Sequence, residues 1–184
     1  MAIVVVGGSG KDVGKTGLVC AVIGALPEFA WTAVKITGHD YDAPGLGRLE
    51  EWGPVIHEEI GVGEATDTAR YLAAGARRAL LATRPGGRVP IDEVRHALGG
   101  DRNVIFESNR IVEEIEADVV LGLIGEGEIK PSFQRLLDVA DAVLSVGSAI
   151  ENVPQAMRRF RLESADRLPV ELVGWLRERL GALR

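Results

Sequence analysis

The sequence predicts an α/β protein in which a mostly parallel central sheet of about six or seven strands carries helices on both faces. The first observation behind this prediction is that short apolar runs alternate with segments whose apolar residues recur at helical spacing. The second is a glycine-rich segment between the first apolar run and the first helical segment, at residues 7–17. Together they predict a three-layer arrangement with ligands bound beyond the carboxyl ends of the strands.

Length and composition indicate one globular domain spanning residues 1–184, with 46% hydrophobic and 26% charged residues. The net charge of −6 disfavours nonspecific attraction to nucleic acid or to an anionic membrane. Cys20 is the single cysteine, which indicates a reducing compartment. The first apolar run is too short for a signal peptide or a membrane span. We therefore expect a cytoplasmic protein that binds neither nucleic acid nor membrane.

The apolar runs and turn residues place the elements along the chain. Strands are expected at residues 2–6, 31–36, 78–83, 103–107, 118–124 and 142–146, with an edge strand at 160–162 as a seventh. Helices are expected from the glycine-rich segment to Leu26, from Asp67 to Ala74 with Thr66 as N-cap and Gly75 at the end, and after Pro90, Pro131 and Pro169. Residues 37–63 fit no regular element, and we expect part of this long segment to move or to cover the site.

The glycine-rich segment has the order of parts that a phosphate-binding loop requires. Small residues let backbone N–H groups converge on phosphate oxygens, and the following helix points its positive end at the same anion. Lys15 would reach the terminal phosphates and act in catalysis, and the Thr16 hydroxyl would hold Mg²⁺. Ser9 stands where the GxxxxGK[ST] pattern has its first glycine. The predicted nucleotide-binding residues are Ser9, Gly10, Lys11, Asp12, Val13, Gly14, Lys15, Thr16 and Gly17. The alternative is a tight turn that binds nothing.

Charged residues at the ends of three other segments complete the predicted site. Glu107 ends an apolar strand and is the predicted carboxylate for magnesium, the alternative being a solvated strand end. Asp40 could contact the metal or orient water, or lie on the surface. Lys35 could neutralise charge during phosphoryl transfer, or extend to solvent. The predicted catalytic set is thus Lys15, Lys35, Asp40 and Glu107, and the predicted metal ligands are Thr16, Asp40 and Glu107.

Two known families share these motifs. The run GSGKDVGKT resembles the phosphate loop of dethiobiotin synthetase, and Lys35 resembles a lysine of that family. More of the chain, residues 1–125, resembles accessory protein B of molybdopterin-guanine dinucleotide biosynthesis. That likeness rests on the loop ending GKT, on VKITGHDYD, and on DTARYLAAGA at residues 67–76. It implies a P-loop NTPase fold, with phosphates at Gly10, Gly14, Lys15 and Thr16, magnesium at Thr16 and Glu107, and a switch role for Asp40.

The sequence departs from these families in several places. Ser108 follows Glu107 where both families more often have glycine, and His39 is the single histidine of its loop. Gly10 occupies the position at which related dimerising ATPases carry a lysine. Because no guanine-reading NKxD motif is evident, the base stays open between ATP and GTP.

The resulting hypothesis is a P-loop NTPase that binds and slowly hydrolyses GTP or ATP with Mg²⁺, as an accessory protein in molybdenum cofactor biosynthesis. One alternative is an ATP-dependent ligase or small-molecule kinase similar to dethiobiotin synthetase. Another is a non-catalytic, nucleotide-gated module that binds a protein. A partner enzyme, a small-molecule acceptor and a homodimer all remain open as partners.

Overall fold

A computed structural model of the chain describes residues 1–38, 46–48, 56–61, 66–83, 88–127, 129–147 and 157–181. The strands are β1 (Ala2–Gly8), β2 (Thr32–Thr37), β3 (Leu46–Arg48), β4 (Ile56–Glu59), β5 (Arg78–Thr83), β6 (Asn103–Glu107), β7 (Val119–Ile124), β8 (Ala142–Val146) and β9 (Arg158–Leu162). The helices are α1 (Lys15–Ala25), α2 (Asp67–Ala73), α3 (Ile91–Leu98), α4 (Pro131–Leu137) and α5 (Val170–Gly181), with 3₁₀ turns at Pro27–Phe29 and Ile111–Glu113.

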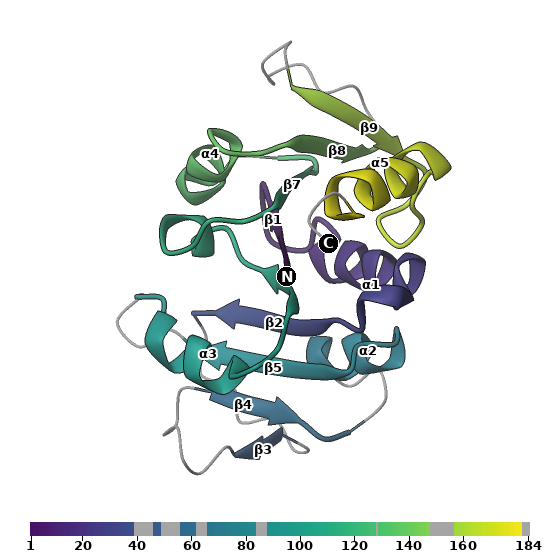
Figure 1. Cartoon of the computed structure of the whole chain (residues 1–184). Helices are drawn as coiled ribbons and strands as arrows, with labels where there is room; N and C mark the ends of the chain where they lie inside the picture. The colour runs from purple at the N-terminus through teal and green to yellow at the C-terminus, as the bar shows by residue number, and fades with distance from the viewer. Residues whose placement is uncertain are drawn as a thin grey trace.

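One mixed sheet forms the centre of the molecule (Figure 1). Its strand order is β3-β4-β5-β2-β6-β1-β7-β8-β9. Neighbours from β5 to β9 in this order pair in parallel, and the two pairings at the other edge, β4 with β5 and β3 with β4, are antiparallel. The predicted fold class, a mostly parallel sheet covered by helices, is therefore confirmed.

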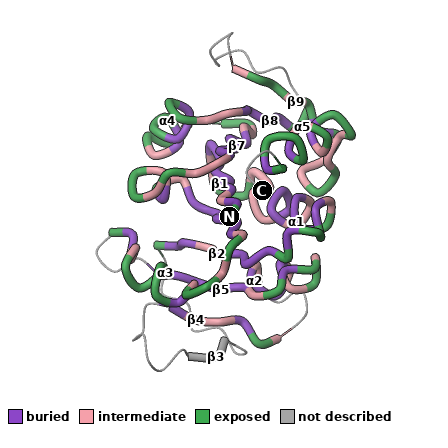
Figure 2. The backbone as a smooth tube through the Cα atoms, in the orientation of Figure 1, coloured by how far each residue is buried: buried purple, intermediate pink, exposed green. Residues whose placement is uncertain are grey.

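Helices cover both faces of the sheet and produce two separate hydrophobic clusters. Side chains alternate along β1, so that Val4 and Val6 pack with α1, α2 and α5, whereas Val5 packs with α3 and α4. In Figure 1, α1, α2 and α5 lie to the right of the sheet, and α3 and α4 lie to its left. Figure 2 shows buried backbone along the central strands and exposure on the outer sides of the helices. The central strands read as continuous apolar runs because both of their faces are covered.

Within the described residues the sheet has nine strands, more than the six or seven expected. The two additional strands, β3 and β4, fall within residues 37–63; β4 pairs antiparallel with β5, and β3 pairs antiparallel with β4. The strand β4 has the sequence IHEE, which is neither an apolar run nor a clear alternation. Glu59 is nonetheless buried, because Thr66, Thr68 and the Gly61 N–H all donate hydrogen bonds to its carboxylate. These donors follow Glu59 by two, seven and nine residues, and the polarity of the strand itself does not reveal them.

The short-range signals at helix ends predicted the helices well. The Thr66 hydroxyl caps α2 by accepting a hydrogen bond from the Ala69 N–H at 3.0 Å, as predicted. Gly75 follows with φ at 104°, in the left-handed region that favours glycine. The edge strand expected at 160–162 is also present, as the last three residues of β9.

Within the described part of the chain, none of the helices combines the length and the apolar character needed to cross a membrane.

Candidate functional site

The carboxyl ends of β1, β2 and β6 open onto one cavity of about 710 Å³. Residues from the glycine-rich loop, from α1 and α2, and from the segments that follow β6, β7 and β9 also line it. The lining residues are Gly10, Lys11, Asp12, Gly14, Lys15, Thr16, Gly17, Lys35, Ile36, Thr37, Gly38, Asp67, Arg70, Glu107, Ser108, Asn109, Arg110, Lys130, Ser132, Ala165 and Asp166. The cavity thus lies at the sheet edge where ligands of open α/β folds bind.

The glycine-rich loop has a tightly constrained backbone. Gly14 has φ at 100°, and a Cβ atom there would approach the Ala165 Cβ to 2.5 Å. At Gly8 a Cβ atom would come within 2.8 Å of the Lys15 side chain. Asp12 also has a positive φ, at 57°, a conformation that aspartate tolerates better than most residues. Both glycines are therefore required by conformation or by packing before any ligand is considered.

Seven of the nine predicted loop residues line the cavity, whereas Ser9 and Val13 do not. Ser9 is buried, and its hydroxyl accepts a hydrogen bond from the Gly125 N–H at 3.0 Å. Its backbone donates to the Leu123 carbonyl at 2.9 Å and accepts from the Lys130 N–H at 3.0 Å. The serine at the first glycine position of the motif therefore fastens the loop to the end of β7 through its side chain.

Lys15 begins α1 and lies over the loop. Its Nζ donates a hydrogen bond to the Gly10 carbonyl at 2.7 Å. Burial lowers the pKa of Lys15, although the nearby Glu107 carboxylate opposes the shift. The positive charge of the Lys15 amine is therefore less stabilised than that of a surface lysine in water. Because Lys15 lines the cavity, a bound anion could supply the negative charge that stabilises it.

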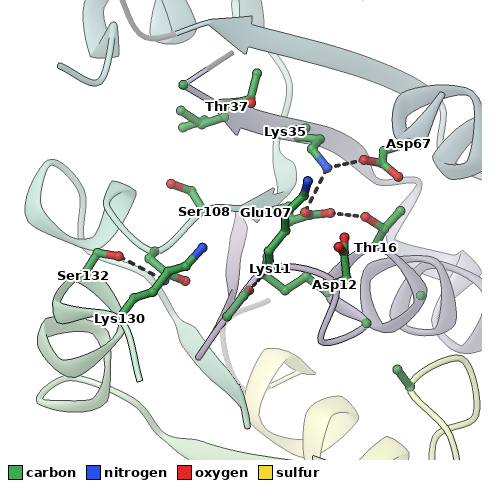
Figure 3. A pocket seen from close by; sticks show the side chains of 18 of the residues that line it. Lys11, Asp12, Thr16, Lys35, Thr37, Asp67, Glu107, Ser108, Lys130 and Ser132 are labelled. Atoms are coloured by element: carbon green, nitrogen blue, oxygen red, sulfur yellow. Dashed lines mark hydrogen bonds and ion pairs between the residues drawn. The ribbon is translucent and has the colours of Figure 1, made fainter. Parts of the chain in front are cut away.

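Glu107 lies at the centre of the hydrogen-bond network at the base of the cavity (Figure 3). Its side chain is buried, and its Oε2 accepts hydrogen bonds from the Thr16 hydroxyl at 2.8 Å and from the Tyr71 hydroxyl. Its Oε1 accepts from Lys35 Nζ at 3.1 Å. Three elements, α1, α2 and β2, thus supply donors to one carboxylate. These contacts offset the cost of burying its charge.

Lys35 bridges Glu107 and Asp67. Its ammonium forms ion pairs with both carboxylates. Burial is the largest single influence and lowers the pKa of Lys35, but the charges and hydrogen bonds of Glu107 and Asp67 together outweigh it and raise the pKa. Lys35 is therefore a half-buried, charged residue of the cavity, and the alternative of a lysine that extends to solvent is not what the structure has.

Sequence reasoning missed Asp67 and Tyr71 as site residues. They stand four residues apart on α2 and so share one face of the helix. Burial and the adjacent Glu107 charge raise the pKa of Tyr71 well above its ordinary value, so the phenol stays protonated and can donate. The only sequence signal was the spacing itself, because nothing local shows that this face of α2 meets the end of β6.

The remaining predicted residue, Asp40, lies outside the described residues, as do His39 and residues 84–87. The structure therefore brings together Lys15, Thr16, Lys35 and Glu107, and Asp40 stays a prediction.

The oxygen atoms near Lys15 fit a hard divalent cation. Mg²⁺ in phosphate sites takes few protein ligands, mainly carboxylate and hydroxyl oxygens, and completes its shell with phosphates and water. The Thr16 hydroxyl and the Glu107 carboxylate supply such oxygens 2.8 Å apart. Among the described residues no group of three or more His, Cys, Asp or Glu side chains could hold a metal by itself. The donor set therefore suits a metal that arrives with a phosphate ligand.

Comparison with known proteins agrees with the fold. No protein-family model matches the sequence, and no curated protein matches it. A crystal structure of a MobB protein homolog from Bacillus stearothermophilus is similar with a TM-score of 0.53 and 20% identity, covering 99% of both chains. LpxK from Aquifex aeolicus, crystallised in complex with ATP, is similar with a TM-score of 0.54 and 14% identity, covering 100% of this chain and 68% of LpxK. These likenesses show the fold, and the chain described above has the P-loop NTPase fold.

Proposed function

We propose that this protein binds GTP or ATP together with Mg²⁺ and hydrolyses the nucleotide slowly. The observation that carries the proposal is the meeting of Lys15, Thr16 and Glu107 at one cavity, with the Thr16 hydroxyl 2.8 Å from the Glu107 carboxylate. These residues come from two segments 91 positions apart. A turn that binds nothing gives no reason for a buried carboxylate to face the loop threonine.

Each residue has a distinct task in this proposal. Backbone N–H groups of the loop bind the phosphates, and the Lys15 ammonium balances charge on the terminal ones. Thr16 and Glu107 hold the magnesium ion, which when bound neutralises phosphate charge. Lys35 lies beside Glu107 and stabilises negative charge that develops on the transferred group. Asp40 retains its predicted role of orienting water or contacting the metal.

The cellular role that we propose is that of an accessory protein in molybdenum cofactor biosynthesis. Two observations support it. The fold matches that of a MobB homolog along 99% of both chains. Residues 1–125 also carry the motifs by which the sequence resembles the molybdopterin-guanine dinucleotide accessory family.

Calorimetric titration of the full chain with ATP and GTP, each with and without Mg²⁺, tests the nucleotide proposal. The wild type should bind at least one nucleotide, and more tightly with Mg²⁺. Lys15→Ala should weaken that binding at least about tenfold, because a hydrogen bond between charged groups is lost. Arg102→Ala is the matched control, since it removes one positive charge at the exposed, opposite end of β6. Binding that is absent in the wild type, or equal in Lys15→Ala, would contradict the proposal.

A second candidate function is phosphoryl transfer to a small molecule, as in a kinase or an ATP-dependent ligase. The observation that favours it is the room beside the loop: the cavity extends beyond the loop to residues after β6 and β7. Nucleotide turnover that depends on an added acceptor would support this candidate. Turnover that is independent of any acceptor, with Lys35→Ala as active as the wild type, would count against it.

A further inference from the structure

The cavity has a second wall that the phosphate loop does not use. It consists of Ser108–Arg110, which follow β6, and of Lys130 and Ser132, at the start of α4, and we call it the second wall. In Figure 3 Lys130 and Ser132 lie on one side of the cavity, whereas Thr16 and Asp67 lie on the other. Its residues form no part of the GxxxxGK[ST] pattern.

The second wall is held rigidly against the beginning of the loop. The Asn109 side chain accepts a hydrogen bond from the Gly8 N–H at 2.8 Å and donates to the Gly8 carbonyl at 2.9 Å. The same amide donates to the Ser132 hydroxyl at 3.2 Å. The Lys130 N–H donates to the Ser9 carbonyl at 3.0 Å. A wall with this many fixed contacts is already organised before a ligand binds, which lowers the entropic cost of binding.

Two polar groups of the second wall are available to a ligand. Ser132 accepts a hydrogen bond from Asn109, which leaves its own proton for another acceptor. Lys130 forms no ion pair within the described part of the chain, whereas Lys35 and Arg70, also in the cavity, both pair with Asp67. Lys130 and Lys15 line the same cavity, so both ammonium groups can act on one bound anion.

The two ends of the loop contact different structures. Near its end, Gly14 and Gly17 lie against Ala165 and Asp166 of the connection between β9 and α5. At its beginning, Gly8 and Ser9 are bonded to Asn109 and Lys130 of the second wall. The Lys15 Nζ, which would meet the terminal phosphate, lies 2.7 Å from the Gly10 carbonyl, so this amine is near the beginning of the loop, where the second wall is bonded.

We infer that the second wall binds the anionic group of a second substrate, a small molecule carrying a phosphate or a carboxylate, through the Lys130 ammonium and the Ser132 hydroxyl. The substrate is then held facing the terminal phosphate of the nucleotide. This inference rests on the proposed nucleotide binding and adds the chemical class of the acceptor to it.

The test uses the full chain saturated with Mg²⁺ and a non-hydrolysable triphosphate analogue, so that the loop is filled. Inorganic phosphate and succinate are then titrated separately by calorimetry. The wild type should bind at least one of them, with a dissociation constant on the order of millimolar. Lys130→Ala should weaken that binding at least about tenfold more than it weakens binding of the analogue, and Lys130→Arg should restore part of it. Arg102→Ala should behave as the wild type.

Several results would overturn the inference. They are binding of neither anion, equal anion binding in Lys130→Ala, or a Lys130→Ala defect confined to the analogue, which would assign Lys130 to the nucleotide. Binding of phosphate alone identifies a phosphate-bearing substrate, and binding of succinate as well identifies a site that accepts carboxylates.

Failure of the nucleotide proposal can be told apart from failure of this inference. If the wild type binds no nucleotide, phosphate is titrated into the protein alone. Loss of phosphate binding in Lys130→Ala but not in Lys15→Ala supports the second wall as a site in its own right. Loss in Lys15→Ala only, or no binding in the wild type, overturns it.

Discussion

Glu107 accepts hydrogen bonds from more side chains of the cavity than any residue of the glycine-rich loop does. It ends an apolar strand and is only 4% exposed, yet its two oxygens receive hydrogen bonds from Thr16, Lys35 and Tyr71. A buried carboxylate without such donors would cost several kcal/mol. The donors also orient the carboxylate toward the loop threonine, which is the position that the proposed role as a magnesium ligand requires. Tyr71 is therefore a positioning residue that acts through Glu107.

Tyr71→Phe tests this role. The substitution keeps the buried ring and removes one donor to a charged acceptor, so the free energy of unfolding should fall by about 1.5–3 kcal/mol. Urea denaturation measures that change. Calorimetry should also show a smaller gain in nucleotide affinity on adding Mg²⁺, an effect that a purely structural role of Tyr71 would not produce. Wild-type stability together with a wild-type magnesium effect would show that the Tyr71 hydroxyl does not position Glu107.

At the level of the element, α2 connects an edge of the sheet to the site. Thr66 caps the helix and donates a hydrogen bond to the buried Glu59 at the end of β4. From the same helix, Asp67 and Tyr71 reach Lys35 and Glu107. The short antiparallel strand β4 and the cavity are thus joined by one seven-residue helix.

Substitution of Thr66 tests the contribution of this helix cap to stability. Thr66→Ala removes the hydrogen bond to the Ala69 N–H and leaves Glu59 with one donor fewer, so stability should fall by about 1–2 kcal/mol. Thr66→Ser, which keeps the hydroxyl, is the matched control and should stay within about 0.5 kcal/mol of the wild type. Thermal denaturation of the three proteins compares them. Equal losses in the alanine and serine variants would mean that the threonine methyl group matters rather than the cap.

At the scale of the whole molecule, segments far from the glycine-rich loop in the sequence contact it and fix its shape. Residues after β7 bond to Ser9, Asn109 after β6 bonds to Gly8, and Ala165 before α5 packs against Gly14. The loop is therefore held by contacts with the segments that follow three parallel strands, β6, β7 and β9. Its shape depends on the assembled sheet as much as on its own glycines.

Gly14→Ala alone and combined with Ala165→Gly separates these two contributions. Alanine at Gly14 meets both an unfavourable positive φ, costing about 1–2 kcal/mol, and a contact of 2.5 Å with the Ala165 Cβ. Adding Ala165→Gly should recover the steric part but not the backbone part. A double-mutant cycle of unfolding free energies should therefore show favourable coupling of at least about 0.5 kcal/mol. Strictly additive effects would place the packing contact in doubt.

Local patterns in the sequence determined a large part of this protein. Apolar runs, proline and glycine positions and the Thr66 cap were enough to predict the layers, all five helices and the parallel strands, because these signals act over a few residues. Strand ends also predicted that Lys35 and Glu107 would meet the loop, since carboxyl ends of parallel strands share one edge.

Only the tertiary structure decided which side chains complete the site. Asp67 and Tyr71 reach Glu107 because α2 packs on β2 and β5, and the second wall faces the loop because Asn109 bonds to Gly8 from 101 residues away. The strands β3 and β4 pair through a polar sequence whose buried Glu59 is satisfied by later residues. The contacts of Lys35, Glu107 and Asn109 join residues 32 to 101 positions apart, so their free energies leave no local pattern in the sequence.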